Sequence, residues 1–102
     1  DREGIRKTFI KNQKVLQGCY EKVLKKNKEV AGRMKLDFDI GDGGKVLRSS
    51  MHTNETGSDD LSRCLVDSLK KFKFPPPPDK KTIQVFYPLY FEGKIVTSDE
   101  ST

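Results

Sequence analysis

The sequence predicts an α+β fold, a two-layer sandwich in which two helices cover one face of a three-stranded antiparallel sheet. Residues 34–40 alternate apolar and charged side chains, which is the period of a half-buried strand. Residues 5–27 and 61–72 instead repeat apolar side chains at three- and four-residue spacing, which is the period of a helix. With a further apolar stretch at 83–91, the order is helix, strand, strand, helix, strand, and we expect the sheet order 2-1-3.

Length and composition indicate a single domain. The chain has 102 residues, of which 33% are hydrophobic, enough for one small core. We expect that core within residues 5–92 and a flexible tail at 93–102. The sequence contains no apolar run of the roughly 20 residues that a membrane span needs, and it does not open with a signal peptide. We therefore expect a domain that lies outside the membrane and belongs to a longer protein.

The first helical stretch is basic. Residues 1–40 contain 11 Lys and Arg against 6 Asp and Glu, whereas residues 41–102 contain nine of each kind. Such a helix is most often a solvated face, which is the interpretation we favour. The alternative is a nucleic-acid-binding face formed by Lys11, Lys14, Lys22 and Lys25.

The first hairpin turns at residues 41–44, Gly-Asp-Gly-Gly, because glycine reaches positive φ without steric cost. A second strand should begin near Lys45. Its alternation changes parity further on, which predicts a β-bulge or bend between Arg48 and Ser50. The lone His52 has no second histidine to share a metal, so we expect an exposed strand-end residue there.

The second helix has clear end signals. Ser58 and two aspartates precede its apolar stripe, and Lys70 and Lys71 follow it, which is the charge pattern that a helix dipole favours. Four prolines at 75–78 then form a stiff segment. We interpret them as a connector into the last strand, rather than as a ligand for an SH3-type domain.

The last strand carries the candidate binding site. Pro88 cannot donate to a sheet ladder, which is typical of an edge strand whose missing N–H points outward. A free edge beside exposed Phe86 and Tyr90 would suit β-strand addition by a partner. The alternative is that these aromatics are covered by the following residues or by a second copy of the chain. The predicted partner-binding residues are Ile83, Gln84, Val85, Phe86, Tyr87 and Tyr90.

The two cysteines each lie on the apolar stripe of one predicted helix. If the helices are neighbours, Cys19 and Cys64 can form a disulfide; the alternative is two buried free thiols. The chain contains no CxxC motif, Ser/His arrangement or phosphate-binding loop, and its Gly-Asp-Gly-Gly turn lacks the further ligands of a calcium loop. We therefore expect no catalytic residues, no cofactor and no metal.

The motifs, taken together, resemble the TonB C-terminal domain superfamily, and most closely its AgmX/PglI-type C-terminal branch. The resemblance covers residues 5–91 and rests on Cys-Tyr-Glu at 19–21, on Cys64, on Gly-Arg-Met-Lys-Leu-Asp-Phe-Asp-Ile at 32–40, on Lys-Phe-Lys-Phe-Pro at 71–75 and on Tyr-Pro at 87–88. Phe72 stands where those domains usually carry Trp.

This resemblance implies a periplasmic domain of a protein anchored in the inner membrane. Its relatives bind extended segments of partner proteins along the last strand, in envelope energy transduction, transport or motility, and use no catalytic residues. We therefore expect a non-enzymatic interaction domain whose partner is another envelope protein, and no nucleic acid.

Overall fold

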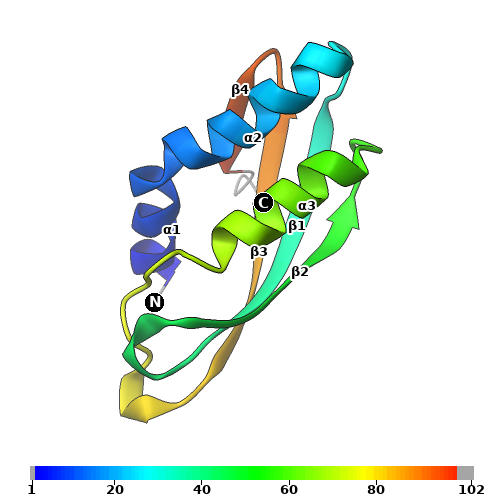
Figure 1. Ribbon diagram of the computed structural model, residues 1–102. Coiled ribbons are helices and arrows are strands. Elements are labelled where there is room, and N and C mark those ends of the chain that lie inside the picture. The colour runs from blue at the N-terminus through cyan, green and yellow to red at the C-terminus, as the bar shows by residue number, and fades with distance from the viewer. Residues whose placement is uncertain (1, 99–102) are drawn as a thin grey trace.

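The computed structural model describes residues 2–98 and has an α+β architecture with an antiparallel sheet. Figure 1 shows α2 and α3 lying in front of that sheet. Two short 3-10 turns, at Asp42–Gly44 and Pro78–Lys80, complete the chain path. The elements follow in the order α1 (Arg2–Lys11), α2 (Gln13–Lys26), β1 (Gly32–Ile40), β2 (Val46–Asn54), α3 (Asp59–Leu69), β3 (Ile83–Glu92) and β4 (Ile95–Ser98).

The sheet order is β2-β1-β3-β4. This confirms the predicted neighbours of the first three strands and adds a fourth strand. β1 pairs with β3 in an unbroken register that runs from Gly32 opposite Phe91 to Ile40 opposite Ile83. The prediction of a flexible tail at 93–102 is wrong for residues 95–98. These residues form β4 and pair with the end of β3. Residues 99–102 lie outside the described part of the chain.

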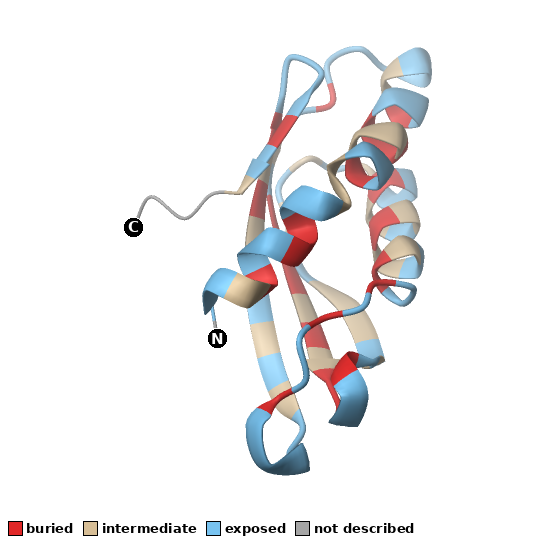
Figure 2. Cartoon of the chain, turned by 90° about the vertical axis from the view of Figure 1, so that its left-hand side faces the viewer, coloured by how far each residue is buried: buried red, intermediate tan, exposed pale blue. Residues whose placement is uncertain are grey.

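One parity of β1, β3 and β4 faces the helices, as alternation predicts. The buried side chains on this face include Phe38 of β1, Phe91 of β3 and Val96 of β4. Figure 2 shows buried residues on both the strands and the helices, where the two layers meet. The opposite parity is largely exposed, with Phe86 at 47%, so the sheet has one covered face and one open face.

An aromatic cluster centred on Phe9 fills one end of the core. The Phe9 ring stacks on Tyr87 with centroids 3.9 Å apart and planes 3° apart, and it meets Phe38 edge-on at 6.0 Å. Phe72 and Phe74, from the segment after α3, lie 5.7 and 5.8 Å from the same ring. Helix α1 thus reaches the core through Phe9, one of the apolar residues that the helical spacing predicts to be buried.

The predicted single helix over 5–27 is two helices, separated at Asn12. The backbone N–H of Asn12 bonds to the carbonyl oxygens of both Thr8 and Phe9, at 3.1 and 3.2 Å, and its side-chain amide donates to the Thr8 oxygen at 2.8 Å. An Asn side chain that bonds to nearby backbone competes with the regular helix ladder. The break changes the helix direction and allows α1 to place Phe9 in the aromatic cluster.

The irregularity expected in β2 exists, but at other positions. The register against β1 shifts at two places, where Leu47 and His52 are the unpaired residues, while Arg48, Ser49 and Ser50 pair regularly. The prediction of a bulge between Arg48 and Ser50 is therefore wrong in position. Each extra residue reverses the facing of those beyond it. His52 is exposed, as expected, and its ring lies on the open face against Phe86.

The glycine turn anchors the segment that leads away from α3. Gly44 has φ +85°, and a Cβ at this position would come within 1.8 Å of the Phe74 carbonyl oxygen. The Phe74 N–H donates to the Gly44 oxygen at 3.0 Å, and Lys45 bridges to Lys73 beside it. Only glycine fits both the conformation and the approach. The turn therefore orients Phe72 and Phe74 toward the core before the proline run begins.

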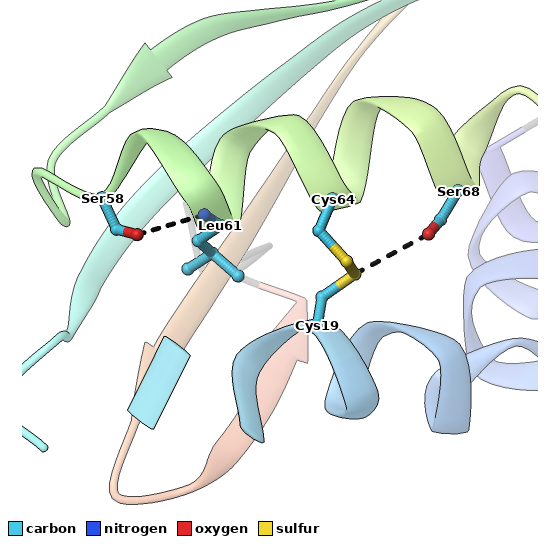
Figure 3. Close-up of a disulfide and its surroundings, with 5 residues drawn as sticks. All are labelled: Cys19, Ser58, Leu61, Cys64 and Ser68. Carbon is cyan, nitrogen blue, oxygen red and sulfur yellow. Dashed lines mark hydrogen bonds between the residues drawn. A yellow bond between two sulfur atoms is a disulfide. The ribbon is translucent and has the colours of Figure 1, made fainter. Parts of the chain in front are cut away.

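A disulfide joins the two helices on the covered face. Cys19 of α2 and Cys64 of α3 are bonded, with their Cα atoms 5.7 Å apart (Figure 3). This is the bridge that the cysteine positions predict. The predicted cap of α3 is also present: the Ser58 hydroxyl accepts a hydrogen bond from the Leu61 N–H at 3.1 Å.

Candidate partner-binding site

The pairing pattern fixes which backbone groups of β3 face away from β1. The Arg33 carbonyl oxygen accepts a hydrogen bond from the Glu55 N–H on the β2 side, at 2.8 Å. The backbone N–H and C=O groups of odd-numbered β1 residues therefore point toward β2, and those of even-numbered residues point toward β3. By the register, odd-numbered residues of β3 then bond to β1. The N–H and C=O groups of Gln84 and Phe86, and the C=O of Pro88, therefore point outward.

β4 covers part of that outward side. It pairs with β3 through a two-residue loop, Gly93 and Lys94, and the paired part of β3 runs from Leu89 to Glu92. Tyr90 is therefore an inner-strand residue, paired with Arg33 on one side and Thr97 on the other. The expectation that the whole of 83–91 forms an edge is wrong for 89–91. Residues 83–88 pair only with β1 among the described residues.

Side chains of α2 protect the outer edge of β4. Gln13 donates from Nε2 to the Val96 carbonyl oxygen at 2.6 Å, and Gln17 donates to the carbonyl oxygen of Lys94. These amides satisfy backbone acceptors that an edge strand would otherwise present to another chain. The β4 edge is thus poorly suited to strand addition.

Helix α1 flanks the next part of β3. Figures 1 and 2 place α1 beside the β3–β4 side of the sheet, and the stacking of Phe9 on Tyr87 holds it there. Below α1 in Figure 2 the start of β3 is uncovered, with half-buried and exposed residues in alternation. An added strand therefore has room at the 83–86 end of β3.

The side chains of the predicted site residues divide by parity. Ile83 and Val85 are half-buried on the helix side, and Tyr87 is buried, with its hydroxyl oxygen 2.6 Å from the Ser98 hydroxyl. Their backbone groups bond to β1, so these three residues offer a partner neither a free ladder position nor an accessible face. Gln84 and Phe86 offer both. The site thus shrinks to two of the six predicted residues, together with the carbonyl of Pro88.

Phe86 is the apolar contact of this site. It is 47% exposed on the open face, and its ring meets the His52 ring edge-on at 5.0 Å. Tyr90 lies on the same face but is half-buried rather than exposed as predicted, with the Arg33 guanidinium 5.6 Å from its ring centroid. The sequence could not identify His52 as a neighbour of Phe86, because the bulge in β2 determines which way His52 faces.

An ion network fixes the polar side of the site. Arg48 bonds to Asp37 at 2.5 Å and to Asp39 at 3.0 Å, and the Gln84 amide donates to Asp37 at 3.0 Å. Hydrogen bonds from Arg48 and then from Gln84 lower the pKa of Asp37, and the two carboxylates raise the pKa of Arg48. The Gln84 side chain is therefore oriented along the sheet surface, which leaves its backbone edge clear.

The break at Asn12 separates the lysines of the proposed nucleic-acid face. Lys11 ends α1, whereas Lys14 lies in the first turn of α2, so they do not belong to one continuous helix. Lys22 and Lys25 lie at the other end of α2, where they line a groove against α3. The structure therefore does not bring these four lysines together on one helix face.

Two further findings concern residues 2–98. None of the helices is long and apolar enough to cross a membrane. Within the same range, His, Cys, Asp and Glu residues form no group of three or more that could hold a metal ion.

Comparison of the chain with protein-family models, curated proteins and solved structures found no match. The likeness to TonB-type domains therefore depends on the motifs quoted above.

Proposed function

We propose that this chain is a non-enzymatic protein-interaction domain that binds an extended partner segment by β-strand addition at the start of β3. The observation that carries the proposal is the outward-facing backbone of Gln84 and Phe86, which pairs with no described strand. An added strand would bond to these groups, and its side chains on the open face would contact the Phe86 ring.

The other sheet edges support this choice by contrast. β2 is interrupted by unpaired residues at Leu47 and His52, and bulges disturb the regular spacing that a new strand needs. The β4 edge bonds to Gln13 and Gln17. The start of β3 has neither protection, and it pairs regularly with β1 from Ile83 onward.

We further propose that the domain works in the periplasm, as part of an inner-membrane-anchored protein of an envelope transport, energy-transduction or motility system. Two observations support this. The Cys19–Cys64 disulfide is of the kind that persists in oxidising compartments. The motifs at 19–21, 32–40 and 87–88 resemble those of TonB-type domains, whose partners are other envelope proteins.

A proline scan with matched alanines tests the binding mode. Peptides are first selected from a displayed random library on the wild-type domain, and their affinity for variants is then measured. Gln84→Pro removes an outward N–H without touching the ladder to β1, and should reduce binding at least tenfold, because one backbone bond and the edge geometry are lost. Gln84→Ala retains the N–H and should bind within about twofold of wild type.

The controls distinguish loss of the edge from loss of the fold. Both variants should keep the thermal midpoint of the wild type to within a few degrees. Val85→Pro, by contrast, removes a donor that faces β1 and should unfold the domain. Equal affinity of the selected peptides for Gln84→Pro and Gln84→Ala would reject strand addition at this edge. Sedimentation at rising concentration tests whether a second copy of the chain is the occupant instead.

A further inference from the structure

A groove with a volume of about 660 Å³ lies between α2 and α3. Of its apolar lining residues, Cys64 is half-buried, whereas Cys19 and Val23 are buried, and Figure 3 shows the Cys19–Cys64 bond spanning the two helices. Because the bond is covalent, it limits how far apart the two helices can move at this point, where the Cα atoms of Cys19 and Cys64 are 5.7 Å apart. The groove belongs to the helix layer and is separate from the edge of β3.

The charge of the groove is strongly unequal. Five cationic and two anionic side chains line it. Asp60 is engaged by Lys26 at 4.0 Å and by Arg63 at 3.6 Å, and Asp67 is engaged by Lys70 at 3.8 Å. The cations that remain without an ion pair to any described residue are Lys22, Lys25 and Lys71.

We propose that this groove binds an acidic segment of a partner protein in extended conformation. Its length follows from α3, whose 11 residues span about 16 Å. An extended chain advances about 3.3 Å per residue, so about five residues fit along the groove. Carboxylates of such a segment would meet Lys22, Lys25 and Lys71, and an apolar side chain between them would contact the half-buried Cys64.

The same features disfavour a uniform polyanion. A phosphate backbone has no apolar side chain to place on the half-buried Cys64. A segment that alternates acidic and apolar residues can contact the lysines and Cys64 together. The proposal does not depend on strand addition at β3, because none of the groove residues belongs to the sheet.

A fluorescence-anisotropy titration of the full chain tests the proposal. The probe is a fluorescein-labelled, end-capped pentapeptide, Glu-Leu-Glu-Leu-Glu. The double variant Lys22→Gln with Lys71→Gln should weaken binding about fivefold or more, because two charge contacts at exposed positions are lost. The double variant Lys7→Gln with Lys14→Gln has the same net charge but changes lysines outside the groove, and it should bind the probe as the wild type does.

Two comparisons separate the outcomes. The probe with Gln in place of each Glu should bind several-fold more weakly to the wild type. Equal weakening by the two double variants would overturn the proposal, because it would mean that net charge alone attracts the probe. A single-stranded oligonucleotide that binds more tightly than the pentapeptide, with the same dependence on Lys22 and Lys71, would overturn it in favour of a nucleic-acid site.

Discussion

The two faces of the sheet use similar residue types for opposite purposes. On the covered face, Phe38 is completely buried and contacts Phe9 and Phe74. On the open face, Phe86 follows Val85, the residue that pairs with Phe38; it is 47% exposed, and its ring meets the His52 ring. Stability is therefore expected to depend on the first ring, whereas the second ring is available to a partner. The comparison shows that strand parity, rather than residue type, decides which of the two rings is buried and which is exposed.

The largest effect is expected at the covered face. Phe38→Ala should lower the free energy of unfolding by about 3–5 kcal/mol, because it removes buried ring contacts and leaves a cavity. Phe86→Ala should change it by less than about 1 kcal/mol. Denaturant titration of both variants measures the difference. If Phe86→Ala proved as costly as Phe38→Ala, the open face would have to be covered in the native protein.

The helices of the covered face should depend strongly on their disulfide. The Cys19→Ala, Cys64→Ala double variant should lose about 3–4 kcal/mol of unfolding free energy, because the bridge closes a 45-residue separation and restricts the unfolded chain. The same titration measures this loss. Mass spectrometry without reductant should find the wild-type chain lighter by two hydrogens than its reduced form. Free thiols in folded, oxidised material would remove the argument for an oxidising compartment.

The cap of α3 is expected to contribute less. Ser58→Ala removes the acceptor for the Leu61 N–H and should cost about 1 kcal/mol of unfolding free energy. Ser58→Thr keeps a hydroxyl and serves as the matched control. A loss of stability no larger for alanine than for threonine would mean that water satisfies the Leu61 donor equally well.

The open face should add a small pH dependence. The pKa of Asp37 lies below its ordinary value of 3.8 because Arg48 and Gln84 bond to its carboxylate. A lowered folded-state pKa stabilises the fold above the unfolded-state pKa, and this contribution fades as the pH falls through the folded-state value. The stability difference between wild type and Asp37→Asn should therefore shrink in acid. In the Arg48→Gln background, this acid-dependent change in the stability difference should be smaller. The same change in both backgrounds would contradict Arg48 as the main cause of the lowered pKa.

Much of the fold follows from local pattern. The alternation at 34–40 predicts the covered face of β1, and Ser58 with its following acids predicts the start of α3. These signals are strong because burial period and capping chemistry act within a few residues. The Cys19–Cys64 disulfide is one of the two alternatives that the sequence left open, and it forms because the two helices share one face of the sheet.

Other features depend on contacts that local pattern does not encode. The break at Asn12 arises from side-chain bonding to Thr8 within an otherwise continuous helical period. β4 is four residues long, and side chains of α2 help to hold it in place. For the candidate site, Pro88 correctly indicated an outward-facing position on β3. How far the edge stays open depends on β4 and α1, which cover the later part of β3. Of the six predicted binding residues, only Gln84 and Phe86 therefore remain in the candidate site.

Amide hydrogen exchange along β3, followed residue by residue, is the most direct measurement of the open edge. The N–H groups of Gln84 and Phe86 point outward and should exchange fast, whereas those of Val85 and Tyr87 bond to β1 and should be protected by several orders of magnitude. Strong protection of all four amides in the isolated chain would contradict the account, because it would show that the edge is already occupied.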